Sequence, residues 1–293
     1  MIALEAFAKV NRSLVVLGLR PDGYHEIDTL FQTIDLSDEI RFEEENRLTL
    51  SIAGSAVPAD DSNLVLRAAR VLSERAGGAR GARLHLSKRI PVGAGLGGGS
   101  ADAAATLLGL NALWRLGLTA EELRPVAAAV GSDVAFFLCG GRARGTGRGE
   151  KIEPLPDPPD ESLVLFLPPF GMATPEVYRA LDAGPVPDSL PPRPDSSAMP
   201  DRNDLEAAAE RLRPELSSLR SALVSQGAVS ARLSGSGSTV FGVFRSEPEA
   251  RAAAAALGRR EGVRALVTRT LPRAEWRRRA LPAAGNEPEG LKP

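Results

Sequence analysis

Residues 91 to 106 read Pro-Val-Gly-Ala-Gly-Leu-Gly-Gly-Gly-Ser-Ala-Asp-Ala-Ala-Ala-Thr. Five glycines in seven positions stand directly before an alanine-rich run that predicts a helix from about Ser100 to Trp114. Glycines let the backbone curl so that several N–H groups point at one spot, and the following helix adds its unpaired first-turn N–H groups and the positive end of its dipole. The segment therefore predicts a phosphate-binding loop that needs no cationic side chain.

Two better-known glycine loops fit this segment less well. A P-loop requires Gly-Lys-Ser/Thr, and no lysine lies between residues 93 and 106. The dinucleotide fingerprint G-x-G-x-x-G is satisfied by Gly93, Gly95 and Gly98, but the acidic residue expected about twenty positions later at the end of a second strand is missing. Glu121 lies instead in a predicted helix start. A flexible linker would not be followed by a strongly apolar helix, so a phosphate cradle of another family is favoured.

The composition bounds the class of protein. The chain has 293 residues, 43% of them hydrophobic, and a formal net charge of −1, so it can bury a large core and we expect two domains. The near-neutral charge gives no basic field for nucleic acid or an anionic membrane, and small-molecule partners are favoured. No apolar run is long enough to span a bilayer and the first residues lack a basic signal segment, so a cytoplasmic protein is expected. The single Cys139 is expected to be a buried small side chain.

Strands and then helices follow one another along the chain, which predicts an α+β fold. The expected strands of the first part cover residues 6–17 (with a bulge near Asn11), 30–35, 39–43, 47–52 and 83–87. The expected helices cover residues 63–76 and 100–114, and a third opens with a capping box between Thr119 and Glu122. The second part is expected to contain a hairpin around Gly140–Gly149, a strand 162–167, an irregular proline-rich loop 182–202, a helix 205–223 interrupted at Pro214, and then elements 229–234, 240–244, 248–257 and 264–270.

Motifs along residues 5 to 275 resemble those of the GHMP kinase superfamily. They are Ala8-Lys-Val-Asn11, Arg20-Pro-Asp-Gly-Tyr-His25 with Leu30-Phe-Gln32, Ser62-Asn-Leu-Val65, the segment from Lys88 to Ala104, Gly131-Ser-Asp-Val134, Asn203-Asp-Leu-Glu206 and Leu233-Ser-Gly-Ser-Gly-Ser238. The glycine loop alone indicates only the superfamily. The triple glycine before Ser100, together with Asp-Gly-Tyr-His, resembles the branch that acts on a cytidyl diphosphate derivative.

The resemblance implies a two-domain α+β kinase with its active site in the cleft between the domains. The N-terminal half, residues 1–155, is expected to resemble the second domain of ribosomal protein S5 and to carry the ATP-binding glycine loop. The C-terminal half, residues 156–281, is expected to be ferredoxin-like. Residues 282–293 are expected to form a disordered tail.

The same resemblance implies a small-molecule kinase. Its reaction would be ATP-dependent phosphorylation of the 2-hydroxyl of 4-diphosphocytidyl-2-C-methyl-D-erythritol, in the non-mevalonate route to isoprenoid precursors. Asp133, an acid in the apolar stretch Val-Gly-Ser-Asp-Val-Ala-Phe-Phe, would act as general base. Lys9, one of only four lysines, would pair with Asp133 and hold the hydroxyl or the γ-phosphate. A purely structural Lys9–Asp133 ion pair is the alternative.

The resemblance also implies the binding residues. ATP would be held by Pro91, Val92, Gly93, Ala94, Gly95, Leu96, Gly97, Gly98, Gly99, Ser100 and Ala101, with Asn63 and Lys88 near the base, although Asn63 could merely cap its helix. His25 would recognise the cytosine edge while Phe31 and Tyr178 stack on the ring. The other expected substrate-binding residues are Asn11, Tyr24, Asp133, Gly235 and Ser236. Mg²⁺ is expected with ATP, but its protein ligands stay unassigned because Gly98 and Gly99 stand where other branches carry a serine ligand.

Two other functions remain to be weighed. A different small-alcohol kinase of the superfamily, of the homoserine or mevalonate type, would give no reason for the Asp-Gly-Tyr-His motif. A catalytically silent nucleotide-binding or RNA-binding protein could use the glycine- and arginine-rich stretch 140–149. The presence of both Lys9 and Asp133 and the near-neutral charge argue against it. Neither nucleic acid nor membrane is therefore an expected partner, and the protein is expected to be a monomer or a homodimer.

Overall fold

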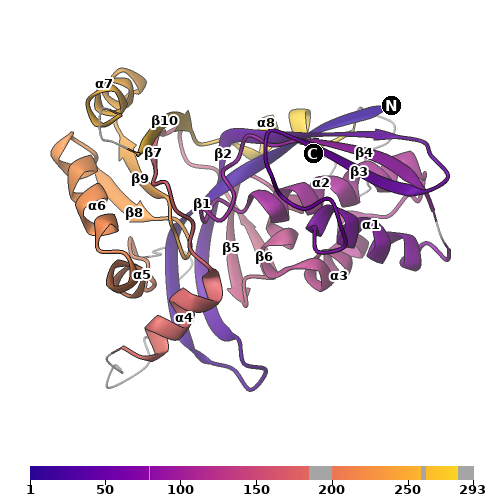
Figure 1. Ribbon diagram of the computed structural model, residues 1–293, viewed down its shortest axis with the longest axis horizontal. Helices are drawn as coiled ribbons and strands as arrows, with labels where there is room; N and C mark the ends of the chain where they lie inside the picture. Colours follow the sequence, from indigo (N-terminus) through magenta and orange to yellow (C-terminus); the bar gives the residue numbers. More distant parts are fainter. Residues whose placement is uncertain (79, 185–199, 259–261, 283–293) are drawn as a thin grey trace.

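Two long strands, β1 (Ile2–Leu19) and β2 (His25–Glu43), form a hairpin that runs through the middle of the molecule (Figure 1). The computed structural model describes residues 1–78, 80–184, 200–258 and 262–282. The hairpin closes through a turn in which the Gly23 N–H donates to the Arg20 carbonyl. The expected irregularity near Asn11 is confirmed, because the pairing register shifts between Asn11 and Ser13.

The prediction of two short strands over 30–35 and 39–43 is wrong, because β2 is continuous. Ser37 pairs with Phe7 across the hairpin, and the pairing continues through Asp38. The polar residues here looked like a break in the sequence. In the structure Asp38 is fully buried beside Lys88, which neutralises its charge.

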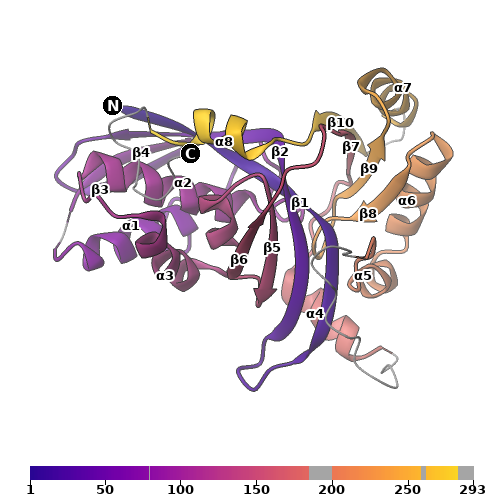
Figure 2. The same cartoon turned by 180° about the vertical axis from the view of Figure 1, so that it is seen from behind.

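The N-terminal half is a six-stranded sheet covered by helices on one face (Figures 1 and 2). The strand order is β3-β4-β2-β5-β6, with β1 pairing with β2. The further strands are β3 (Leu48–Ala53), β4 (Ala82–Ser87), β5 (Arg142–Gly147) and β6 (Lys151–Leu155). The covering helices are α1 (Leu64–Arg75), α2 (Gly98–Leu113), α3 (Ala120–Val130) and the short 3₁₀ helix η1 (Ser132–Leu138). The main core lies between this sheet and α2, which is buried along most of its length.

The predicted helices of this half are confirmed with small changes at their ends. Asn63 caps α1, and the capping box between Thr119 and Glu122 opens α3. α2 begins at Gly98, two residues before the predicted start, because Gly97 in the left-handed region is its N-cap. η1, which presents Asp133, was not expected from the sequence.

The C-terminal half has an antiparallel sheet of order β10-β7-β9-β8. This order confirms the expected ferredoxin-like fold, in which two β-α-β units interleave. Helices α6 and α7 pack on the sheet, and the interrupted helix at Pro214 is confirmed as the pair α5 and α6. The bounds are β7 (Ser162–Leu167), α4 (Thr174–Asp182), α5 (Glu206–Leu212), α6 (Glu215–Ser225), β8 (Ser230–Leu233), β9 (Val240–Phe244), α7 (Glu247–Leu257) and β10 (Arg264–Arg269).

After β10 the chain returns to the N-terminal half and forms α8 (Arg273–Ala280), which lies beside β1 and near the N-terminus (Figure 2). Trp276 and Leu281 are buried in the N-terminal core. By packing, this segment therefore belongs to the first half, whereas the expected boundary after residue 155 assigns it to the second.

Two sequence expectations fall largely outside the described residues. They concern the proline-rich loop, of which residues 185–199 are not described, and the tail, of which residues 283–293 are not described. Within the part of the chain that is described, no helix has the length and apolar character needed to cross a membrane.

Candidate active site

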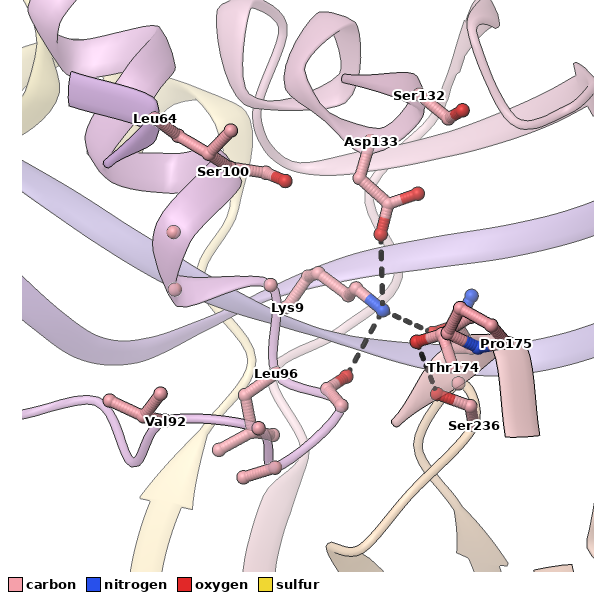
Figure 3. Close-up of a pocket in the computed structure, with 18 of the residues that line it drawn as sticks. Lys9, Leu64, Val92, Leu96, Ser100, Ser132, Asp133, Thr174, Pro175 and Ser236 are labelled. Carbon is pink, nitrogen blue, oxygen red and sulfur yellow. Dashed lines mark hydrogen bonds and ion pairs between the residues drawn. The ribbon is translucent and has the colours of Figure 1, made fainter. Parts of the chain in front are cut away.

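A cleft of about 890 Å³ lies between the two halves. The glycine loop, the β1–β2 hairpin, η1 and β5–β6 line it from the first half, and α4 and the turn around Gly235 line it from the second. Figure 3 shows Lys9 near its centre, with Asp133 on one side and the glycine loop on the other.

The glycine loop has the conformation that its composition predicts. Gly93, Gly95 and Gly97 have φ of +68°, +73° and +72°, values that other residues rarely adopt. Space is also limiting, since a Cβ on Gly95 would lie 2.1 Å from the Ser234 carbonyl oxygen. The loop therefore depends on glycine both for its backbone conformation and for its close approach to the second half.

Four successive carbonyl groups of the loop are held by hydrogen bonds from outside it. The donors are the Met172 N–H to Gly93 (3.1 Å), the Thr239 N–H to Ala94 (3.1 Å), the Ser234 hydroxyl to Gly95 (2.9 Å) and the Lys9 N–H to Leu96 (3.0 Å). With the carbonyl groups fixed in this way, the first-turn N–H groups of α2 remain for an anion, because a helix has no internal acceptor for them. The loop thus has the shape of a phosphate cradle, and both halves of the protein hold it in that shape.

Lys9 and Asp133 form the ionic centre of the cleft. Lys9 Nζ lies 3.6 Å from Asp133 Oδ2 and donates to Asn11 Oδ1 (2.5 Å) and to the Gly95 carbonyl (3.1 Å) (Figure 3). The Lys9 side chain is 4% exposed, whereas that of Asp133 is 33% exposed. Burial lowers the pKa of the Lys9 ammonium, and the negative charge of Asp133 offsets this only in part. Asp133 is therefore the accessible member of the pair, and Lys9 is a fixed cation beside the cradle.

Two of the residues expected to recognise the base, His25 and Tyr178, lie together near the tip of the hairpin. The His25 and Tyr178 rings stack with centroids 4.7 Å apart and planes 26° from parallel. His25 Nε2 lies 2.8 Å from Asp182 Oδ1, so α4 fixes the imidazole. Burial, followed by the charge of Asp133, raises the pKa of the Tyr178 phenol, which stays protonated at neutral pH. Tyr24 is 53% exposed in the same part of the cleft.

Phe31 is placed differently from the expectation that it stacks on a base. It lines the floor of the cleft but is only 1% exposed, and its ring packs on Phe136 with centroids 4.8 Å apart. The Lys9 ammonium lies 5.6 Å from the Phe31 ring centroid. Phe31 thus offers no open face to a base and supports Lys9 from the core side.

The other end of the cleft holds the residues expected near the base of ATP. Asn63 Oδ1 accepts from the Val65 N–H (3.0 Å) and its Nδ2 donates to the Pro58 carbonyl (2.7 Å), so the amide is engaged in capping α1. Lys88 lies beneath the loop and its ammonium is shared by Asp38 and Asp102. Both residues line the cleft, but their polar groups already have protein partners.

The second glycine turn closes the cleft from the C-terminal half. Gly235 has a φ of +57°, and its carbonyl accepts a hydrogen bond of 2.7 Å from Asn203 Nδ2. The Ser236 and Thr174 hydroxyl groups lie 2.8 Å apart (Figure 3). This turn therefore faces the glycine loop and the start of α4 at once.

The structure brings nearly all of the expected site residues to one cleft. The exception is Ala101, which is 2% exposed and faces the core of the first half, because it lies on the inner side of α2. Sequence reasoning missed Arg148, whose guanidinium lies 4.8 Å from the Tyr24 ring, and Asp182 and Thr174 on α4. Arg148 stands in the predicted hairpin of residues 140–149, where its proximity to Tyr24 is not visible in the sequence.

The described residues contain no group of three or more His, Cys, Asp or Glu side chains that could hold a metal ion. Magnesium prefers oxygen ligands and usually binds through substrate phosphates with one or two carboxylates. Asp133 is the half-buried carboxylate at the cradle, and by itself it does not make a metal site.

A glycine cradle joined to a lysine–aspartate pair, between a helix-covered sheet and a ferredoxin-like half, is the arrangement of a GHMP kinase. Residues 63–141 match the GHMP kinases N terminal domain, and residues 195–264 match the GHMP kinases C terminal region. Within this class, the chain belongs to the 4-diphosphocytidyl-2-C-methyl-D-erythritol kinase family. It is 42% identical over 286 residues to the family member of Pelotomaculum thermopropionicum (92% of this chain, 98% of the relative) and 46% identical over 272 residues to that of Cereibacter sphaeroides (87% and 94%).

Solved structures agree with this placement. A crystal structure of 4-(cytidine 5'-diphospho)-2C-methyl-D-erythritol kinase is 39% identical, with a TM-score of 0.78 over 92% of this chain and 99% of the other. Homoserine kinase from Cytophaga hutchinsonii (20% identical, TM-score 0.66, 93% and 95% covered) and L. major mevalonate kinase (15%, 0.69, 93% and 96%) share the fold.

Proposed function

We propose that the protein transfers the γ-phosphoryl group of ATP to the 2-hydroxyl of 4-diphosphocytidyl-2-C-methyl-D-erythritol, a step of the non-mevalonate route to isoprenoid precursors. The observation that carries the proposal is the position of the Lys9–Asp133 pair. It lies between the glycine cradle, which suits a triphosphate, and the His25–Tyr178 stack, which suits a pyrimidine. A substrate with a cytidyl group at one end and an alcohol at the other would place its hydroxyl beside Asp133.

Phosphoryl transfer to an alcohol needs orientation, charge stabilisation and a place for the hydroxyl proton. In this proposal Asp133 orients the 2-hydroxyl and accepts its proton. Lys9 pairs with Asp133 and provides positive charge where the γ-phosphoryl group crosses. Asn11 fixes Lys9, and its own Nδ2 donates to Thr29 Oγ1 (2.7 Å). Mg²⁺ would accompany ATP and neutralise phosphate charge, held chiefly by the phosphate oxygens.

Recognition of the cytidyl group is assigned to His25, Tyr24 and Tyr178. Stacking on an aromatic ring is a common way to bind a single base, and the imidazole supplies an edge hydrogen bond. Arg148 adds a positive charge on this side of the cleft, suited to the diphosphate of the substrate. Both substrates are water-soluble nucleotides, so we place the enzyme in the cytoplasm, as a monomer or homodimer with small-molecule partners.

The test is ADP release from Mg-ATP with four samples: the cytidyl substrate, homoserine, mevalonate, and the cytidyl substrate with an Asp133→Asn variant. We expect turnover with the cytidyl substrate alone, and a loss of about 10²- to 10⁴-fold in kcat in the variant. ATP binding should survive, because the loop backbone is held by Met172, Thr239, Ser234 and Lys9 and not by Asp133. Turnover of homoserine or mevalonate instead would contradict the proposed acceptor substrate. Full activity of Asp133→Asn would contradict the role of Asp133 as the general base.

A further inference from the structure

Two carboxylates and one ammonium group are buried together beneath the glycine loop. Lys88 Nζ donates to Asp38 Oδ2 (2.5 Å) and to Asp102 Oδ2 (2.7 Å). The side chain of Lys88 is 5% exposed, that of Asp38 0% and that of Asp102 4%. We refer to Asp38, Lys88 and Asp102 as the buried triad.

The buried triad joins the two ends of the loop. Asp38 Oδ1 accepts hydrogen bonds from the backbone N–H groups of Arg89 (2.5 Å) and Ile90 (2.8 Å), where the chain leaves β4. Asp102 stands at the opposite end, in the second turn of α2. The Lys88 ammonium also lies near the start of that helix, since a Cβ added to Gly98 would be 3.3 Å from its Nζ. The distance between the end of β4 and the start of α2 is therefore set by these three side chains.

The charges of the triad do not balance when both carboxyl groups are ionised. Both oxygens of Asp38 have donors, whereas Asp102 Oδ1 is buried without a hydrogen-bond partner. An ionised carboxylate with a bare buried oxygen is unfavourable. Burial raises the pKa of Asp102 to about 7, with Lys88 opposing the shift and the charge of Asp38 adding to it. Among the described residues, the charged groups that act on Asp102 are Lys88, at the end of β4, and Asp38, on β2.

We propose that the buried triad is a positioning device that holds the glycine loop in its nucleotide-binding shape, and that protonation of Asp102 strengthens nucleotide binding. An ionised Asp102 leaves a net negative charge directly beneath the cradle, where it repels the nucleotide phosphates. Affinity for nucleotide therefore falls as the pH rises through neutrality. This inference rests on the nucleotide site of the proposed function and adds to it a residue and a pH dependence.

The experiment measures the dissociation constant of ADP by titration calorimetry at pH 6, 7 and 8. For the unaltered protein we expect about a three- to tenfold weakening from pH 6 to pH 8, the size expected for one charge at this range after screening. Asp102→Asn is neutral at every pH and keeps the shape of the side chain, so its affinity should not weaken. Deprotonation of ADP itself has the opposite sign, since it adds charge that the cradle attracts.

Asp157→Asn is the matched control. Asp157 also accepts two backbone hydrogen bonds, from Arg142 and Arg273, but it does not line the cleft. It should keep the unaltered pH profile. In turnover assays Asp102→Asn should change the pH profile of KM for ATP and leave that of the cytidyl substrate as it was.

The outcomes separate the two proposals. An unaltered protein that binds no ADP contradicts the proposed function. ADP binding that does not weaken from pH 7 to pH 8, where the ADP phosphates are already ionised, overturns the role of Asp102, and this measurement needs no variant to fold. The same weakening in Asp102→Asn as in the unaltered protein overturns it as well.

Discussion

The Ser234 hydroxyl donates a hydrogen bond of 2.9 Å to the Gly95 carbonyl and so joins the two glycine turns of the cleft. Ser234 is fully buried. The neighbouring hydrogen bond from the Thr239 N–H to the Ala94 carbonyl also joins the second half to the loop. The loop of the first half is therefore held by the second half. Its shape depends on how the two halves meet, and not on the glycines alone.

Ser234→Ala should raise KM for ATP about fivefold, the equivalent of one hydrogen bond of ordinary strength. kcat at saturating ATP should change less, because Lys9 still donates to Gly95. Initial-rate kinetics at varied ATP concentrations measure both KM and kcat. Ser225→Ala removes a hydroxyl bonded to the Ala222 carbonyl at the end of α6 and serves as control. Equal KM values for the two variants would contradict the role of Ser234.

Gly95→Ala should abolish measurable nucleotide binding. The new Cβ would meet the Ser234 and Gly237 carbonyl oxygens at 2.1 and 2.8 Å, and neither backbone can withdraw without opening the cleft. Gly117→Ala is a close control, because Gly117 has a similar φ of +66° but nothing within 4 Å of a Cβ. It should cost about 1–2 kcal/mol of folding stability from the left-handed backbone alone and keep nucleotide binding. Loss of binding in both variants would mean that backbone strain, and not the clash, is responsible.

The rate should fall at alkaline pH through loss of the Lys9 proton. Burial lowers the pKa of Lys9 below its usual value of 10.5, so the charged form is present at lower pH and is lost as the pH rises through the lowered pKa. Lys9→Arg keeps a positive charge throughout this range. Its kcat should be lower, because the larger head group displaces Asn11, but its alkaline decline should disappear. A decline at the same pH in both proteins would assign it to another group.

Tyr178→Leu should weaken binding of the cytidyl substrate and leave binding of ATP unchanged. Loss of one stacking ring costs about 1–3 kcal/mol, or roughly a five- to 150-fold rise in KM for the cytidyl substrate. The ATP site lies on the other side of Lys9, so KM for ATP in the same variant is the internal control. A rise in both values would indicate that α4 has moved and not that a base contact was lost.

Local signals in the sequence were enough for most of the fold. The cap at Asn63, the capping box at Thr119 and the break at Pro214 depend on neighbouring residues, and the structure confirms them. The continuity of β2 was missed because its explanation is not local. Asp38 looks like a break until Lys88, fifty residues later, is placed beside it. α8 was missed because half of its residues are arginines and Trp276 is its one large apolar side chain.

The candidate site shows the same division. The glycine loop can be recognised from its composition, and the roles expected of Lys9 and Asp133 come from the family resemblance. The burial of Phe31 and the inward face of Ala101 depend on packing against residues far away in the chain. Asp182 and Arg148 could be assigned only once α4 and the β5–β6 hairpin were placed beside residues 24 and 25.

The return of α8 to the first half has a consequence for synthesis on the ribosome. Trp276 packs so closely on Gly140 that a Cβ there would lie 2.1 Å from the indole ring. The first half emerges from the ribosome long before this indole is made, and apolar surface around Gly140 stays uncovered until then. N-terminal domains generally fold first during translation, and transiently exposed apolar surface favours aggregation. This protein instead seals its first core only after its second half has been made.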